Sequence, residues 1–141
     1  WERAIKLITK NLEDIKEKVM QSRHEVRMHF SPPDFRRLML NADIAISGGG
    51  CTLYELAAAG TPAVAVIHAD NQVMLAEHLG REGFCLVTDY RKKAWRKLLE
   101  KQIRYMDNNI VRKEMSEKGK LLISLNGVEN IADEIIDGTE S

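Results

Sequence analysis

Short apolar runs alternate along the chain with longer stretches in which apolar residues recur every three or four positions. Three of these runs lie in the middle of the chain, at Asp43–Ile46, Ala63–Ile67 and Phe84–Val87. Short continuous apolar runs are typical of strands buried on both faces, and the periodic stretches between them predict helices. The pattern therefore predicts an α/β fold in which a parallel sheet carries helices on both faces.

The predicted helices between these strands have recognisable ends. A helix over Asp34–Asn41 precedes the first run, a second covers Cys51–Ala59 and ends at Gly60, and a third covers Asn71–Arg81. Right-handed crossovers place the loops after residues 30, 47 and 67 along one edge of the sheet, where α/β folds bind ligands.

The first thirty residues leave one choice open. Ala4–Thr9 fits a short buried strand, which we favour, but it also continues a helix face that runs from Trp1 to Val19. With the strand, Asn11 caps a helix that ends near Ser22. Glu25–Phe30 alternates polar and apolar residues, which predicts a further strand.

From Tyr90 onward the pattern is helical, and Gly127 is expected to break it before a last helix over Val128–Ile136. Two predicted apolar faces are Trp95, Leu98, Leu99, Ile103 and Met106, and Ile110, Met115, Leu121 and Leu122. Arg91–Lys120 holds eleven Lys or Arg against four Asp or Glu, an excess of seven positive charges. We favour a solvated helix surface over a nucleic-acid patch, because no exposed aromatic residues interleave with the charges. A membrane contact is a weaker alternative.

Composition narrows the functional classes. The chain has 141 residues, 44% of them hydrophobic, and a formal net charge of zero, which suits one domain without a general attraction to nucleic acid. No apolar run approaches the roughly 20 residues needed to cross a bilayer, so we expect a cytoplasmic protein. Cys51 and Cys85 lack metal-ligand spacing and are expected to be reduced thiols. Because the chain begins with Trp1 and not Met, we expect a piece of a longer protein.

The glycine loop, Gly48–Thr52, is the first candidate site. Three glycines after a buried strand leave the backbone bare, and a helix follows whose first N–H groups and dipole favour an anion such as phosphate. The loop lacks both the Lys-Ser/Thr ending of a P-loop and the spaced glycines of a dinucleotide fingerprint, so a hinge needed for packing is the alternative. Glu55, on the first turn of the helix, could bind a pair of ribose hydroxyls or simply pair with the helix dipole.

The next predicted loop contains Asp70, Asn71 and Gln72, whose side chains can bind sugar hydroxyls, although N-capping explains one of them. His68 ends the preceding strand and is either a polar contact or a structural histidine. Phe30, Ser31, Pro32 and Pro33 would offer a ring and free backbone groups to a planar base, or form an ordinary strand exit.

Several of these segments together resemble the C-terminal domain of GT-B nucleotide-sugar enzymes, of the glycosyltransferase family 28 C-terminal type. The matching segments are Val26–Phe35, Ala42–Glu55, Gly60–Pro62 and Asp70–Gln72, within a resemblance that covers about Ala4 to Ile136. Within it the chain is most similar to the UDP-sugar hydrolase of pseudaminic acid biosynthesis and to spore-coat polysaccharide proteins. The lipid II-forming N-acetylglucosaminyltransferase is more distant.

The resemblance implies a Rossmann-like half of a GT-B enzyme that binds a UDP-sugar without a cofactor or metal. Gly48, Gly49, Gly50, Cys51 and Thr52 would hold the diphosphate, and Cys51 stands where relatives often carry serine. Glu55 would bind the ribose, His68, Asp70, Asn71 and Gln72 the sugar, and Phe30, Ser31 and Pro32 the base. The family's N-terminal domain, an expected partner, supplies the acceptor pocket and, in the hydrolase, the catalytic histidine, so we expect no catalytic residue in this chain.

Such domains usually begin with a further strand and phosphate loop, and we expect this chain to be truncated at that strand. Two other functional classes stay open. The chain could be a binding or regulatory module that lost its chemistry, because fold does not fix function. It could also be an interaction domain that docks a membrane or nucleic acid through the basic helices of Arg91–Lys120.

Overall fold

The computed structural model describes residues 15–18, 20–21, 25–27, 29, 32–124, 126–127, 132 and 134–136. The chain divides into two compact units, Trp1–Pro33 and Asp34–Ser141, and the sheet lies in the second. The expectation of a single domain over residues 1–141 stays a prediction.

The described residues of the first unit form helix but no strand. Residues 15–18 and Met20 are helical, as predicted, and Ile15 is 46% exposed. Residues 25–27 and His29 are exposed and belong to no strand, so the predicted strand Glu25–Phe30 is wrong at these positions. Alternating side chains favour a strand, but a strand forms only where a neighbour accepts its backbone hydrogen bonds. Ala4–Thr9 and Asn11 lie outside the described residues.

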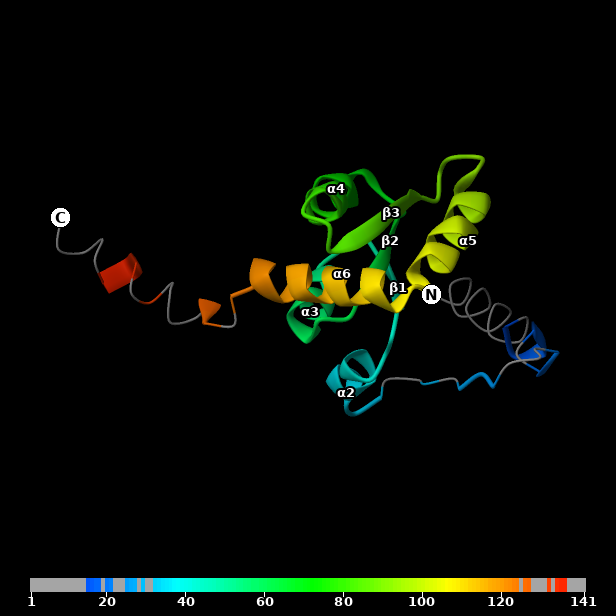
Figure 1. Cartoon of the computed structure of the whole chain (residues 1–141), viewed down its shortest axis with the longest axis horizontal. Helices are drawn as coiled ribbons and strands as arrows, with labels where there is room; N and C mark the ends of the chain where they lie inside the picture. The colour runs from blue at the N-terminus through cyan, green and yellow to red at the C-terminus, as the bar shows by residue number, and fades with distance from the viewer. Residues whose placement is uncertain are drawn as a thin grey trace, which may run out of the picture. The chain divides into compact units, whose positions relative to one another are not determined.

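Three parallel strands form the sheet of the second unit, in the order β1–β2–β3 (Figure 1). They are β1 at Ala45–Gly48, β2 at Ala63–Ile67 and β3 at Cys85–Asp89. β2 has the predicted bounds, β1 begins two residues later than predicted and includes Gly48, and β3 continues to Asp89. The predicted α/β architecture with a parallel sheet is confirmed.

Helices precede β1 and connect the strands, close to the predicted positions. They are α2 at Phe35–Leu40, α3 at Thr52–Ala59, and α4 at Val73–Arg81, which follows the short 3-10 helix η1 at Asp70–Gln72. The Asp34 side chain accepts a hydrogen bond from the Arg37 N–H at 2.9 Å and caps α2. Gly60 ends α3 with φ of 70°, in the left-handed region where glycine avoids the strain of a Cβ atom.

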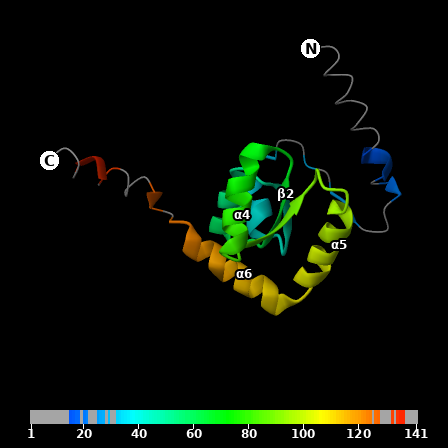
Figure 2. The ribbon, with the colours of Figure 1, turned by 90° about the horizontal axis from the view of Figure 1, so that it is seen from above.

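Both faces of the sheet are covered, because β2 alternates its side chains between two cores. Ala63, Ala65 and Ile67 pack with Leu53, Leu56 and Leu79 of α3 and α4. Val64 points the other way and packs with Met106 and Met115. Figure 2 shows the corresponding layers, with α4 and α5 on opposite sides of β2. The continuous apolar run of β2 is therefore explained by burial on both faces, where all five of its residues are buried.

Two long helices follow the sheet, α5 at Trp95–Met106 and α6 at Asn109–Leu122. Met106 and Met115 are buried as predicted, whereas Ile110 and Leu121 are exposed, at 66% and 86%. α6 ends at Leu122, Ile123 and Ser124 are not helical, and Gly127 is itself helical, so the predicted break before the last helix is present but lies before Gly127. The described residues of the predicted last helix, 132 and 134–136, are helical.

Some of the basic side chains after Tyr90 support neighbouring helices. Arg112 donates to the carbonyls of Met106 at 2.7 Å and Asp107 at 2.9 Å, at the end of α5. The side chain of Lys120 lies against Gly60, which ends α3. Cations at helix C-termini satisfy free carbonyl groups and interact favourably with the helix dipole. Part of the positive excess of Arg91–Lys120 therefore has a structural role.

Both cysteines are free thiols, as predicted. Cys51 is exposed, and burial raises the pKa of the Cys85 thiol to about 12. Within the described ranges, no helix has the length and apolar character needed to cross a bilayer. The same part of the chain holds no group of three or more His, Cys, Asp or Glu residues placed to hold a metal ion.

Candidate functional site

The loops that follow the three strands lie at the carboxyl edge of the sheet, and backbone hydrogen bonds join them. The Gly49 N–H donates to the Val66 carbonyl at 3.1 Å, and the Tyr90 N–H donates to the Ile67 carbonyl at 3.0 Å. These bonds continue the parallel ladder one residue beyond each strand pair. The loops after β1, β2 and β3 therefore have fixed positions relative to one another.

Two glycines of the loop after β1 differ in their surroundings: one is packed against a neighbouring element and the other faces open space. Gly49 is buried, and a Cβ atom there would lie 3.1 Å from the Gln72 Cβ and 3.4 Å from the Ala76 Cβ. A side chain at this position would push η1 or α4 outward by a few tenths of an ångström, so the close approach favours glycine. Gly50 faces open space, since a Cβ atom there would meet no atom within 4 Å. Gly50 is thus not required by packing within the described part of the chain.

The backbone N–H groups at the start of α3 point to an anion site. Leu53 and Tyr54 donate to the carbonyls of Gly50 and Cys51, at 3.0 and 2.9 Å. In contrast, the N–H groups of Gly50, Cys51 and Thr52 donate no hydrogen bond to another described residue. Free N–H groups beside bare glycine backbone, at the positive end of a helix dipole, favour a phosphate group.

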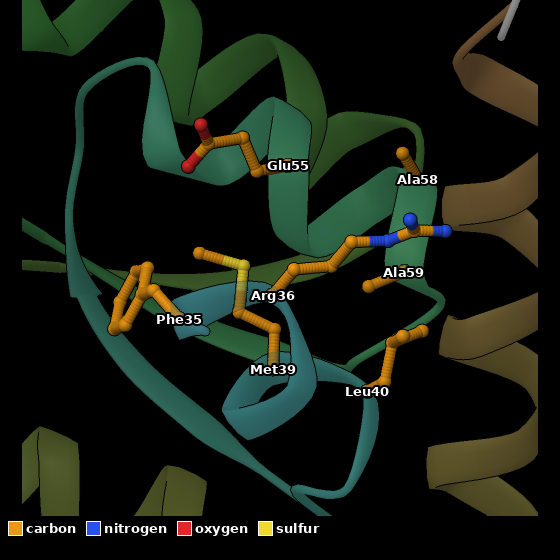
Figure 3. A pocket seen from close by; sticks show the side chains of 7 residues that line it. All are labelled: Phe35, Arg36, Met39, Leu40, Glu55, Ala58 and Ala59. Atoms are coloured by element: carbon orange, nitrogen blue, oxygen red, sulfur yellow. The ribbon is translucent and has the colours of Figure 1, made fainter. Parts of the chain in front are cut away.

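A mostly apolar cavity of about 420 Å³ lies between α2 and α3 (Figure 3). Figure 3 shows the α2 side chains on one wall and those of α3 on the other; the lining residues are Phe35, Arg36, Met39, Leu40, Glu55, Ala58 and Ala59. Glu55 is exposed, lies one turn after Cys51 on α3 and also lines this cavity. The Thr61 hydroxyl donates to the Met39 carbonyl at 2.7 Å and fixes α2 at this position.

The predicted sugar-binding residues differ in their surroundings. The Gln72 side-chain oxygen accepts a hydrogen bond from the His68 N–H at 2.9 Å, which orients the Gln72 amide and joins the two ends of the loop. Asn71 is exposed, and the carboxylate of Asp70, which is 95% exposed, pairs with Arg91. Gln72 also packs against Gly49, so the glycine loop and η1 are in direct contact.

Arg91 links the loop after β3 to the loop after β2, and it was not predicted from the sequence to belong to the site. Its Nε and Nη2 atoms donate to the two carboxylate oxygens of Asp89 at 2.9 and 3.0 Å, and its backbone N–H donates to Asp89 Oδ1 at 3.0 Å. The third side-chain nitrogen, Nη1, binds Asp70. Arg91, Asp89 and Asp70, here called the arginine cluster, therefore connect the end of β3 to η1. The side-chain hydrogen bonds from Arg91 lower the pKa of Asp89 to about 2.

The pH dependence of the arginine cluster follows from this shift. Because the pKa of Asp89 is lower in the folded chain than its ordinary value of about 3.9, the cluster stabilises the fold above that value. This contribution is lost as the pH falls toward about 2. In a carbon-13 NMR titration, the Asp89 carboxyl should titrate near pH 2, and Arg91→Met should move its midpoint up toward about 3.9. Arg96→Met is the control and should leave Asp89 unchanged; an unshifted midpoint in Arg91→Met would contradict the assignment.

Aromatic rings form a row at the same edge. The ring centroids of His68 and Tyr90 are 5.4 Å apart, and those of Tyr90 and Trp95 are 5.2 Å apart. The Arg96 guanidinium lies over the Trp95 ring, 5.2 Å from its centroid. His68, Tyr90 and Trp95, here called the aromatic row, join the loop after β2 to the start of α5. Only His68 was predicted from the sequence to belong to the site.

The predicted base-binding segment is largely untested. Phe30 and Ser31 lie outside the described residues, and Pro32 is half-buried in the first unit. Their role in base binding, like the other assigned ligand contacts, stays a prediction. Within the second unit, the structure brings together the glycine loop, His68 and Gln72, and it adds Phe35 of the cavity and Arg91 to the residues found from sequence.

Comparison with known protein families identified a match that covers most of the chain. The profile of the glycosyltransferase family 28 C-terminal domain matches residues 4–135, which include the glycine loop, Glu55, η1 and the arginine cluster. Comparison with curated proteins gave no match. The family match therefore spans every part of the site described above.

Proposed function

Because the chain belongs to the family of glycosyltransferase family 28 C-terminal domains, we propose that it is the UDP-sugar-binding domain of a glycosyltransferase-like enzyme or a UDP-sugar hydrolase. The observation that supports this proposal best is the free backbone at Gly50, Cys51 and Thr52, at the start of α3 and next to Glu55. A nucleoside diphosphate has both groups that these features suit, a phosphate anion and a ribose with paired hydroxyls.

The proposed orientation of the nucleotide follows from charge. The diphosphate accepts hydrogen bonds from the free N–H groups of the glycine loop, and the Glu55 carboxylate accepts from the ribose hydroxyls on the side away from the phosphates. The base then lies toward the apolar cavity, where the Phe35 ring is available for contact. This arrangement keeps the carboxylate from facing the diphosphate directly, which would cost electrostatic energy.

The sugar is proposed to lie over η1. Gln72 has its oxygen committed to the His68 N–H, so its NH₂ group is the part that can donate to a sugar hydroxyl. The exposed Asn71 amide can both donate and accept.

In the reaction, the glycine loop would stabilise the negative charge that develops on the departing diphosphate. The nucleophile or base would come from the N-terminal domain of the enzyme, and this chain alone would bind without turnover.

Two further details of the proposal are supported by the sequence resemblance alone. These are a role in surface polysaccharide or nonulosonic-acid biosynthesis and a specificity for uridine nucleotides. The cytoplasmic location expected from the sequence likewise stays a prediction. A non-catalytic nucleotide-binding module would share the same site, and adding the N-terminal domain distinguishes the two, because only the enzyme would then turn over UDP-sugar.

UDP should bind the 141-residue chain and shift the NMR signals of the Gly48–Glu55 amides. Glu55→Ala removes a charged hydrogen-bond acceptor, and the loss of one hydrogen bond to a charged group costs about 1.5–3 kcal/mol, so UDP affinity should fall roughly 10-fold to 150-fold. The measurement is a titration followed by two-dimensional NMR. Glu117→Ala, a change at an exposed residue of α6, should leave the affinity unchanged. If millimolar UDP caused no shifts in these amides, the nucleotide-site proposal would be wrong.

A further inference from the structure

The carboxylate of Asp70, the first residue of η1, has one oxygen committed and one oxygen open. Its Oδ1 atom pairs with Nη1 of Arg91, and the side chain as a whole is 95% exposed. Within the described part of the chain, no other residue donates a hydrogen bond to this carboxylate. A carboxylate has two oxygens and about four acceptor sites, so Asp70 can bind Arg91 and a ligand hydroxyl at the same time.

Asp89 fixes the direction of the Arg91 guanidinium. The Asp89 side chain is only 14% exposed, and it accepts hydrogen bonds from the backbone N–H, Nε and Nη2 of Arg91 at 3.0, 2.9 and 3.0 Å. Because a guanidinium is planar and rigid, two hydrogen bonds to one carboxylate determine where its third nitrogen points. Asp89 also pairs with Ile67 in the β2–β3 register, so this anchor stands beside the end of β2, where the loop to η1 begins.

The Asp70 carboxylate lies within reach of the proposed donor sugar. β1 and β2 are adjacent strands, about 4.8 Å apart, and Gln72 of η1 packs against Gly49 of the glycine loop. A 3-10 helix rises about 2 Å per residue, so Asp70 and Gln72 are separated by only about 4 Å along the axis of η1. A sugar bonded to a diphosphate at the glycine loop would therefore extend over both residues.

We propose that Arg91 is a positioning residue, which holds the Asp70 carboxylate ready to accept a hydrogen bond from a hydroxyl of the donor sugar. This inference rests on the proposed function, because it needs the diphosphate at the glycine loop. An exposed aspartate without a partner rotates freely and loses that freedom when it binds a sugar. The ion pair with Arg91 orders the carboxylate before the sugar binds, which lowers the cost of binding. Arg91 thus acts through Asp70 and does not itself contact the sugar.

The test compares the affinities of UDP and three UDP-sugars for the whole 141-residue chain. The sugars are UDP-glucose, UDP-galactose and UDP-N-acetylglucosamine, and each titration is followed by two-dimensional NMR. In Arg91→Met, the affinity for the UDP-sugar that the unchanged chain binds most tightly should fall roughly 2-fold to 12-fold, the cost of ordering one side chain. The affinity for UDP should stay constant, because UDP has no donor sugar for Asp70 to bind.

A second variant tests whether Arg91 acts through Asp70. Asp70→Ala removes a charged acceptor, so the affinity for the same UDP-sugar should fall roughly 10-fold to 150-fold. In the Asp70→Ala background, Arg91→Met should have no further effect on this affinity. Arg81→Met is the matched control, since Arg81 forms an exposed ion pair with Glu77 on α4, which ends near the amino end of β3. It should leave all the affinities unchanged.

Three results would overturn the inference. The first is an equal effect of Arg91→Met on UDP and on the UDP-sugar, including no effect on either, because Arg91 would then at most fasten β3 to η1. The second is a further loss when Arg91→Met is added to Asp70→Ala. The third is a chain that binds UDP but none of the three UDP-sugars. Failure of the proposed function is recognised separately, as a lack of UDP-induced shifts in the amides of the glycine loop.

Discussion

Gly50→Ala should abolish most UDP binding while the chain stays folded. A Cβ atom at Gly50 would meet no atom within 4 Å, so the folded chain has room for the methyl group. Gly50 is also not among the described glycines with positive φ, which are Gly60 and Gly83, so alanine can adopt its backbone conformation. The free energy of unfolding should therefore change by less than about 1 kcal/mol.

The same methyl group would stand where the proposed diphosphate approaches the N–H groups of Gly50 and Cys51. Inserting a methyl group into a packed contact costs about 1–3 kcal/mol, which corresponds to roughly 5-fold to 150-fold weaker UDP binding. Thermal unfolding and a UDP titration measure the two effects. Gly127→Ala is the control, because a Cβ atom there is equally free of neighbours and the position is remote from the glycine loop in sequence. Unchanged UDP affinity in Gly50→Ala, with the fold intact, would place the diphosphate elsewhere.

Strands and helices of the second unit could be predicted because their signals are local. The apolar run Ala63–Ile67 became β2 with the same bounds, since burial on both faces needs continuous apolar residues. The glycine loop and the helix after it could also be located, because a glycine cluster between an apolar run and a helical pattern is typical of a strand-to-helix turn. The alternation at Glu25–Phe30 misled the prediction, since it carries no information about whether a neighbouring strand is present.

The contacts that complete the site could not be predicted, because they join residues that are distant in sequence. Arg91 binds Asp70, 21 positions earlier, and from sequence it was only one charge in a basic segment. Tyr90 becomes a neighbour of His68 through the β2–β3 register, which the sequence does not specify. The sequence did contain one local signal for the arginine cluster. Asp89 lies two residues before Arg91 at the end of a strand, and an aspartate at such a position favours a turn in which its carboxylate accepts a backbone hydrogen bond.

Phe84 and Gly119 should be strong determinants of the stability of the second unit, because they hold α6 against α3. Phe84 is fully buried, and a Cβ atom at Gly119 would lie 2.6 Å from the Phe84 Cδ2 and 3.2 Å from the Ala57 Cα of α3. Phe84→Ala should cost about 3–5 kcal/mol of unfolding free energy, a large share of the total stability of a small domain.

Gly119→Ala should cost about 1–3 kcal/mol through overpacking, less the gain of up to about 1 kcal/mol that alanine brings to a helix. In the Phe84→Ala background the same change should cost much less, because the ring that it would strike is gone. Denaturant unfolding of the two single variants and the double variant gives the interaction energy between the positions. Additive effects would show that the ring and the glycine do not pack against each other. UDP affinity measured under native conditions should stay constant, since neither residue lies at the carboxyl edge that carries the glycine loop.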